Sequence, residues 1–160
     1  KTYSQSLKLF HKAKKNNVLL YVDEVQSFLN KKIILKKHNF ITRQKQGSGN
    51  PKDLLFRFAY HDFYFLYEKV KKYKISNIKI INIKDCLEFK IDFGNKTFFF
   101  HYNLNSKKKI HTFNSINLIT KKDVLSKMIK DVLNEKVDFK NNKNKSLFAN
   151  KLIDKIIKKI

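Results

Sequence analysis

The chain is poor in several residue types, and each scarcity limits what the protein can be. It has one cysteine, Cys86. A single cysteine excludes an internal disulfide and a zinc site built from cysteines, and it favours a reducing compartment. No apolar run approaches the roughly 20 residues that span a bilayer, so no membrane span is expected, and no signal peptide is visible.

Acidic residues are also scarce, with 13 Asp and Glu against 36 Lys and Arg, which gives a formal net charge of +23. Such an excess opposes compaction by self-repulsion, and a polyanionic partner relieves it. Nucleic acid is therefore the leading partner class, and an anionic membrane surface is the second. AT-rich codon usage explains why lysine outnumbers arginine, but it does not explain the shortage of acidic residues.

Glycine and proline are rare and concentrated in one place. The chain has three glycines and one proline, and the stretch ITRQKQGSGNP (41–51) contains Gly47, Gly49 and Pro51. This composition predicts a loop whose backbone turns tightly and approaches a polyanion closely. The alternative is an ordinary solvated connector that carries lysines like the rest of the chain.

Hydrophobic spacing predicts an α+β fold in which an antiparallel sheet is covered on one face by helices, with an appended C-terminal helix. Strands are expected at 6–10, 31–37, 54–59, 78–102 and 115–120. Helices are expected at 17–29, 62–73, 123–134 and 146–160, with Asp62 as a cap. Residues 103–111 read as a basic loop and 135–145 as a polar linker. The predicted units are an α+β domain over 1–134 and a basic linker with an amphipathic helix over 135–160.

The strongest local signal is a hairpin. In LEFKIDF (87–93) apolar residues alternate strictly with Glu88, Lys90 and Asp92, which predicts a strand with one buried and one wet face. The pair Gly94-Asn95 then separates this strand from KTFFFHY, as in a two-residue hairpin turn.

Candidate catalytic residues are few. Glu88 and Lys90, with Asp85 or Asp62 as a second acid, could bind Mg²⁺ as in restriction-type nucleases, although such a pattern is usually a solvated strand face. Histidines 11, 38, 61, 101 and 111 lack paired metal spacing and are interpreted as surface or RNA-facing residues. The glycine-rich stretch lacks the GK[ST] of a P-loop. No enzymatic activity, cofactor or metal is therefore expected.

Aromatic and basic patterns leave two questions open. Tyr60 and Tyr102 could stack on bases, but core packing is the favoured interpretation of the aromatic stripes. The C-terminal helix could lie on a membrane, or its apolar stripe could dock on this domain or on a neighbouring protein.

A resemblance to a known family follows from the order of these stretches. NKKIILKKHNFITRQKQGSGNP, LLFRFA and DFYFLYEKV resemble the universal L-five family of large-subunit ribosomal proteins, without a gap from residue 49 to residue 70. SINLITKKDVLSKMI and FFFHYN resemble the later strand, helix and connecting strand of that family. Residues 79–88 are shorter than the family's Gly- and Arg-rich loop that reaches the P-site tRNA. The divergence, with AT-rich codon usage, suggests a mitochondrial form.

The resemblance implies a structural constituent of the mitochondrial large ribosomal subunit, located in the matrix and bound to rRNA in the central protuberance. The implied partners are large-subunit rRNA, 5S rRNA where present, neighbouring ribosomal proteins, the P-site tRNA and small-subunit head proteins. A Mg-dependent nuclease or another basic nucleic-acid-binding protein is the alternative function. The residues expected to contact RNA are Lys31, Lys36, Lys37, His38, Arg43, Lys45, Lys52 and Arg57.

Overall fold

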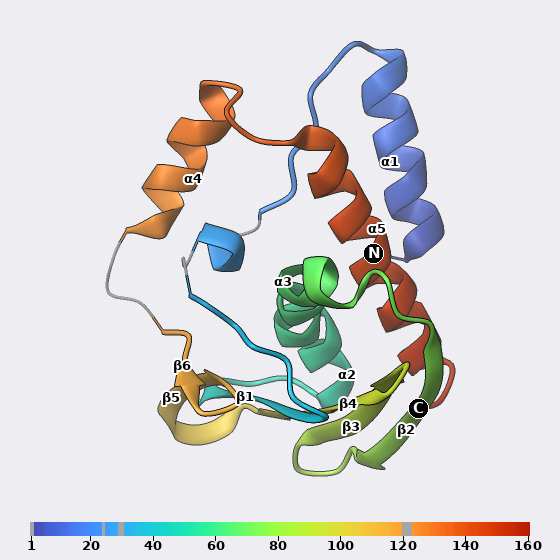
Figure 1. The fold of residues 1–160 in the computed structure, drawn as a ribbon, viewed down its shortest axis with the longest axis vertical. Helices are drawn as coiled ribbons and strands as arrows, with labels where there is room; N and C mark the ends of the chain where they lie inside the picture. The colour runs from blue at the N-terminus through green and yellow to red at the C-terminus, as the bar shows by residue number, and fades with distance from the viewer. Residues whose placement is uncertain (1, 24, 29–30, 120–122) are drawn as a thin grey trace.

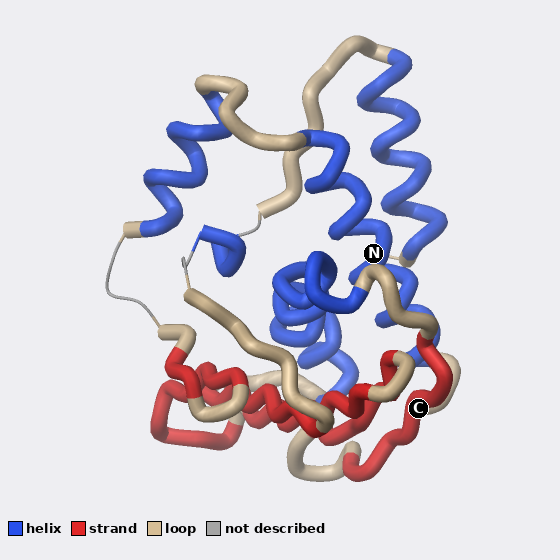
Figure 2. Tube along the Cα trace, viewed as in Figure 1, coloured by secondary structure: helices blue, strands red, loops and turns tan. Residues whose placement is uncertain are grey.

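Six strands form one mixed sheet, and the long helices all lie on the same side of it (Figure 1). The computed structural model describes residues 2–23, 25–28, 31–119 and 123–160. Figure 2 shows the two layers, with the strands below and the helices above. The predicted α+β fold, with a sheet covered on one face by helices and a C-terminal helix, is confirmed, but the sheet expected to be antiparallel contains one parallel pair.

The order of strands across the sheet is β2-β3-β4-β1-β5-β6. The strands are β1 (His38–Gln46), β2 (Ile75–Asn82), β3 (Leu87–Phe93), β4 (Lys96–Asn103), β5 (Asn105–Phe113) and β6 (Ile116–Asn117). All neighbouring pairs are antiparallel except β1 and β4, which are parallel. The first strand along the chain is therefore inserted into the middle of the sheet, between two strands that follow each other in sequence.

The helices pack on one another above the sheet. The helices are α1 (Tyr3–Lys15), α2 (Pro51–Leu54), α3 (Tyr60–Val70), α4 (Val124–Leu133) and α5 (Phe139–Ile157), with a 3₁₀ helix at Val25–Phe28 and a π-helical turn at Leu55–Ala59. Since α2, the π-helical turn and α3 are continuous, residues 51–70 form one long helical segment. α5 packs on α3, and α1 packs on α5.

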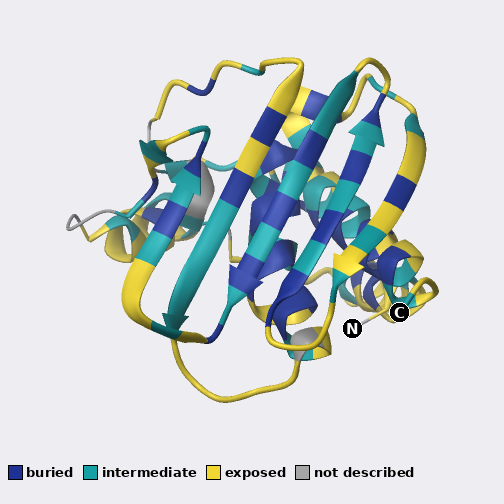
Figure 3. Ribbon diagram, turned by 90° about the horizontal axis from the view of Figure 1, so that it is seen from below, coloured by how far each residue is buried: buried dark blue, intermediate teal, exposed yellow. Residues whose placement is uncertain are grey.

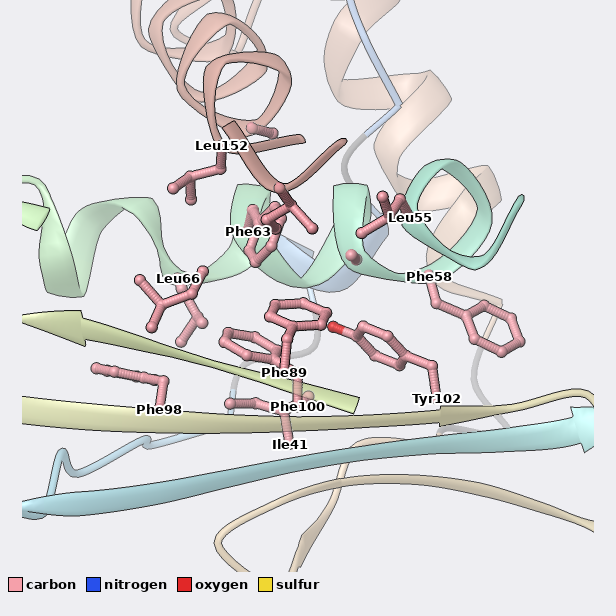
Figure 4. Close-up of a cluster of buried hydrophobic side chains, with 14 of the residues drawn as sticks. Ile41, Leu55, Phe58, Phe63, Leu66, Phe89, Phe98, Phe100, Tyr102 and Leu152 are labelled. Atoms are coloured by element: carbon pink, nitrogen blue, oxygen red, sulfur yellow. The ribbon is translucent and has the colours of Figure 1, made fainter. Parts of the chain in front are cut away.

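The core between α3 and the sheet is aromatic (Figure 4). The ring centroids of Phe89 and Phe100 lie 4.7 Å apart in a stacked pair, and Phe63 of α3 meets Phe100 edge-on at 5.3 Å. All three side chains are at most 2% exposed. The alternation predicted for residues 87–93 places this apolar face against the helices, which leaves the other face of the sheet wet (Figure 3).

The C-terminal helix docks on its own domain, as one of its two interpretations predicted. Leu152, Ile153 and Ile156 of α5 are fully buried in the core cluster. The hydroxyl of Tyr64 also donates a hydrogen bond of 2.9 Å to the backbone oxygen of Asn142. Because this apolar stripe is buried, it is not available to a membrane. In the part of the chain that the structure describes, no helix has the length and hydrophobicity of a membrane span.

The predicted hairpin between residues 87 and 103 is confirmed. Phe93 pairs with Lys96, so Gly94 and Asn95 form a two-residue turn between β3 and β4. Gly94 has φ +58°, a backbone conformation that costs an L-residue about 1–2 kcal/mol. A Cβ added there would also lie 3.2 Å from Cδ1 of Tyr73.

We therefore expect Gly94→Ala to lower the free energy of unfolding by about 1–2 kcal/mol, measured by urea denaturation. Gly47→Ala is the matched control, because its new Cβ would meet only the flexible Cδ2 of Leu104, at 3.2 Å, and Gly47 has no positive φ. An equal loss in both variants would show that the turn conformation does not limit stability.

The rare glycines and the proline at 47–51 connect a strand directly to a helix. Gly49 has φ +143°, and Asn50 then caps the helix that begins at Pro51. Asn50 and Asp53 each accept a hydrogen bond of 3.1 Å from the other's backbone N–H. Pro51 occupies the first helical position, where its missing N–H costs no hydrogen bond. The loop predicted over 41–51 is shorter than expected, because residues 41–46 belong to β1.

Two of the predicted N-terminal elements are wrong. Residues 6–10, expected as a strand, lie inside α1. The helix expected at 17–29 is absent from the described residues 17–23, and only a single 3₁₀ turn follows at Val25–Phe28. Thr2 and Gln5 form the capping box that begins α1, a signal that the apolar spacing alone did not reveal.

The elements around β1 also differ from prediction. The strand expected at 31–37 is irregular, and β1 begins only at His38. The strand expected at 54–59 is helical, because its buried residues Leu55, Phe58 and Ala59 recur at the spacing of a helix face. Asp62 is not a helix cap but a buried residue of α3.

Later boundaries shift as well. The basic loop expected at 103–111 is wrong, because most of it belongs to strand β5 (Asn105–Phe113). The strand expected at 115–120 is reduced to the two residues of β6, with residue 120 outside the described residues. The helix expected at 123–134 is confirmed as α4, with Asp123 as its N-cap. The sequence expected as a linker at 135–145 contributes the first turns of α5, capped by Asp138.

Candidate functional site

A cleft of about 670 Å³ opens at the β5–β6 end of the sheet, on the helix-covered side. Its walls come from β1, β5, the 3₁₀ helix and the first turn of α4. In Figure 1, α4 lies above this end of the sheet, away from α3 and α5. The residues named below as the cationic cleft are Arg43, Lys45, Lys107, Lys109 and His111.

The pairing of β1 with β5 brings the side chains of the cationic cleft together. Arg43 lies directly opposite His111 in the antiparallel register. The guanidinium carbon of Arg43 lies 4.8 Å from the ring centroid of Phe58, and Nζ of Lys45 lies 5.6 Å from the same centroid. Phe58 is 2% exposed, so this buried ring orients both cations by cation–π contact.

A buried carboxylate lies behind the wall of the cleft. Asp62 is 2% exposed, and its Oδ1 lies 2.9 Å from Nε2 of His111 and 3.9 Å from Nη1 of Arg43. Burial would raise the pKa of Asp62, but the charge and hydrogen bond of His111 and the charge of Arg43 outweigh it and hold this pKa below its ordinary value. Asp62 is therefore a fixed negative charge at neutral pH.

Two other groups beside Asp62 are held neutral. Burial, and then the charge of Arg43, lower the pKa of His61. Burial, followed by the charge and proximity of Asp62, raises the pKa of Tyr102 well above its ordinary value. At neutral pH the imidazole of His61 is thus uncharged and the hydroxyl of Tyr102 keeps its proton.

This arrangement can bind an anion and move a proton. Four cationic side chains line a cleft of a size that accommodates small ligands. Because Nε2 of His111 faces Asp62, Nδ1 is the ring nitrogen left for a molecule in the cleft. A carboxylate that fixes the orientation and tautomer of an imidazole makes it an effective general acid or base. Asp123, which also lines the cleft, uses its carboxylate to cap α4 at the backbone N–H of Ser126.

Of the residues predicted to contact RNA, the structure brings only Arg43 and Lys45 into the cleft. Lys31, Lys36 and Lys37 are exposed in the irregular segment before β1, and His38 is exposed where that strand begins. Lys52 is exposed in α2. Arg57, also exposed, donates a hydrogen bond of 2.7 Å to the backbone oxygen of Ser48 and so supports the glycine turn.

The sequence reasoning missed Lys107, Lys109 and His111. These residues follow each other at a spacing of two, which is the signal of a strand with one cationic face. His111 was interpreted as a surface or RNA-facing residue, but it is buried. For Tyr102 the favoured interpretation, core packing, is confirmed, because this side chain is fully buried and cannot stack on a base.

The residues considered for a nuclease do not form one site. Glu88 and Lys90 lie on the wet face of β3, whereas Asp62 is buried between the sheet and its helices. Asp85 is exposed in the turn between β2 and β3. Glu88 instead faces His101, with Oε1 2.7 Å from Nδ1.

Comparison with known proteins identifies the fold alone. No protein-family model matches the chain, and no curated protein matches its sequence. UDP-N-acetylglucosamine 3-dehydrogenase GnnA from Acidithiobacillus ferrooxidans is similar in structure, with a TM-score of 0.71, 10% identity, and coverage of 93% of this chain and 66% of that chain. The WlbA (WbpB) dehydrogenase from Thermus thermophilus, solved in complex with NAD and α-ketoglutarate, has a TM-score of 0.71, 7% identity, and coverage of 95% and 60%. The dehydrogenase MviM from Clostridium difficile has a TM-score of 0.69, 15% identity, and coverage of 99% and 68%.

The chain thus spans about two-thirds of the length of these solved structures. They overturn the resemblance to the ribosomal L-five family, and with it the expected role in the large ribosomal subunit and the expected partners among rRNA, tRNA and ribosomal proteins. The same structural similarity contradicts the nuclease alternative and the expected absence of enzymatic activity. Residues 49–70 show why the resemblance to the ribosomal family misled. The ungapped match there required a strand at 54–59, but the chain is helical from Pro51 to Val70.

Proposed function

We propose that this chain is a substrate-binding domain of an oxidoreductase and that it holds a phosphate-bearing hydroxy compound in the cationic cleft. The observation that carries the proposal is the Asp62–His111 pair at the wall of a cleft lined by Arg43, Lys45 and Lys109. Cations bind the phosphate groups, and the oriented imidazole lies where it can accept the proton of a substrate hydroxyl. The similarity to structures named as dehydrogenases supports this class of reaction.

A nucleotide diphosphate sugar is the substrate class that fits the cleft best. Its diphosphate matches several cations, and the cleft volume of about 670 Å³ lies within the range of small-molecule sites. One of the similar structures is named as a UDP-N-acetylglucosamine 3-dehydrogenase, and WlbA was also solved with UDP-GlcNAcA.

The described residues do not fit the NAD that the WlbA structures contain. A dinucleotide places its pyrophosphate on free N–H groups at a helix N-terminus, after a glycine-rich turn between parallel strands. Here the turn Gly47–Gly49 is followed by Asn50 and Asp53, which already cap the helix and add a carboxylate. The side chain of Leu104 also closes the space beside Gly49, since a Cβ there would lie 3.3 Å from Cδ1 of Leu104. We therefore assign the chain to the substrate and not to the dinucleotide.

Binding of UDP-N-acetylglucosamine, measured by titration calorimetry with the whole chain, tests this proposal. We expect UDP-N-acetylglucosamine and UDP to bind, and N-acetylglucosamine and NAD not to. Lys45→Glu and Lys109→Glu should each weaken UDP binding by more than about tenfold, because each removes a charge-assisted contact and adds a repulsion.

Lys90→Glu is the matched control, since it makes the same change in net charge on the opposite face of the sheet. It should leave UDP binding within about twofold of the unmodified chain, because exposed charges beyond a Debye length are screened at physiological salt. Tight binding of NAD without binding of UDP, or equal losses in Lys90→Glu and Lys45→Glu, would overturn the assignment.

A further inference from the structure

A second cluster of side chains lies on the wet face of the sheet, the face shown in Figure 3. It consists of Cys86, Glu88 and His101, whose sulfur, carboxylate oxygen and ring nitrogen all lie within 4.8 Å of one another. Cys86 is buried, while the side chains of Glu88 and His101 are about one-third exposed. The cluster belongs to no part of the cationic cleft, which lies on the helix-covered side of the sheet.

Strand register explains how residues 15 positions apart in sequence meet. Cys86 immediately precedes β3, and Glu88 follows two residues later, so both project from the same face. Glu88 lies directly opposite His101 in the antiparallel pairing of β3 with β4. Sequence analysis looked for pairs of histidines at the spacing of metal ligands. It missed this cluster, which contains a single histidine on β4 and whose other two residues lie at the start of β3.

Neighbouring amides hold two of the three groups in place. Nε2 of the Gln44 amide lies 2.8 Å from Nε2 of His101. The amide nitrogen of Gln44 can only donate, so Nε2 of His101 accepts this hydrogen bond, and Nδ1 carries the proton that Glu88 accepts in the absence of metal. Metal binding releases this proton and leaves the lone pair of Nδ1 to the ion. The amide of Asn82 donates to the sulfur of Cys86 at 3.4 Å. Such outer hydrogen bonds orient the ligands of metal sites.

We propose that Cys86, Glu88 and His101 bind a first-row divalent cation, and we assign Zn²⁺ as the preferred ion. Thiolate, imidazole and carboxylate are the three ligand types that Zn²⁺ takes in proteins, and three protein ligands leave a fourth position open. In a tetrahedral zinc site the ligand atoms lie roughly 3.3–3.8 Å apart, so small side-chain rotations within the 4.8 Å cluster suffice.

The charges of the ligands also favour a divalent cation. The protein carries a formal net charge of +23, so a cation binds only where anionic ligands are concentrated. The thiolate of Cys86 and the carboxylate of Glu88 together supply two negative charges, which balance those of the ion. In the absence of metal, the hydrogen bond between Glu88 and His101 satisfies both groups and keeps them together.

Cobalt substitution tests the site directly, since a Co²⁺–thiolate bond gives a charge-transfer absorption that oxygen and nitrogen ligands do not give. Titration of the whole chain with Co²⁺ should produce this absorption at a stoichiometry of one, and Zn²⁺ should displace it. Cys86→Ser should abolish the absorption. Glu88→Gln and His101→Gln should weaken Co²⁺ binding by more than about 100-fold, and Gln44→Ala by about 10–100-fold.

His38→Gln is the control for the loss of a histidine, because His38 is exposed on β1 and lies outside the cluster. It should bind Co²⁺ like the unmodified chain. Circular dichroism and thermal unfolding of each variant separate loss of the site from loss of the fold, and Glu88 and His101 are exposed enough to be replaced without unfolding. Absence of the charge-transfer absorption, or binding that depends on His111 and not on His101, would overturn the proposal.

Discussion

Phe100→Ala should lower the free energy of unfolding by about 3–5 kcal/mol, enough to unfold a large fraction of an ordinary domain at 37 °C. The ring of Phe100 stacks on Phe89 at 4.7 Å, meets Phe63 edge-on at 5.3 Å and is 2% exposed. Its removal leaves a cavity between the sheet and α3 that these rigid aromatic neighbours cannot fill. Urea denaturation followed by circular dichroism measures the loss.

The adjacent residue gives the matched control. Phe99 is the same residue type on the same strand, but it points to the wet face, where its ring stacks on Phe40 at 5.1 Å. Phe40 is 55% exposed, so Phe99→Ala should cost less than about 1.5 kcal/mol. Comparable losses of stability at both positions would mean that the wet face of the sheet is also buried in solution. The two layers of sheet and helices would then not account for all of the packing.

Prediction from sequence succeeded where one strand face is buried and the other is wet. The hairpin of β3 and β4 was predicted correctly, because the alternation of apolar and polar residues and the position of the glycine turn indicate the same structure. The strand predicted at 54–59 was wrong because five apolar residues in a run of six fit a strand and a helix equally well by composition. Packing decides between them, since Leu55, Phe58 and Ala59 reach the core only when the segment is helical.

The functional residues were harder to predict than the fold. Arg43 and Lys45 were selected because they lie beside the glycine turn, and both do line the cleft. Asp62 and His111 are 49 positions apart, and they meet only because β5 pairs with β1 beneath α3. Lys107 and Lys109 were not selected, because the run of lysines around them predicted a basic loop and not the strand β5.

Asp62→Asn should lower the free energy of unfolding by about 3–5 kcal/mol at neutral pH, the cost of removing one partner from a buried ion pair. The substitution keeps the size of the side chain, but it leaves Arg43 without its buried counter-charge and weakens the hydrogen bond to His111. Asp85→Asn removes an exposed carboxylate, and it should change stability by less than about 0.5 kcal/mol.

The stability of the Asp62→Asn variant should also depend less on pH in the acid range. Because the folded pKa of Asp62 lies below its ordinary value of 3.8, its ionised form stabilises the native state at any pH above that value. This contribution is lost as the pH falls below about 4 towards the folded pKa, since the unfolded chain takes up the proton first. Stability measured from pH 7 to pH 3 should therefore fall less steeply in Asp62→Asn than in Asp85→Asn. Parallel curves for the two variants would show that the carboxylate of Asp62 is not paired in the folded protein, and the proton-accepting role of His111 would lose its basis.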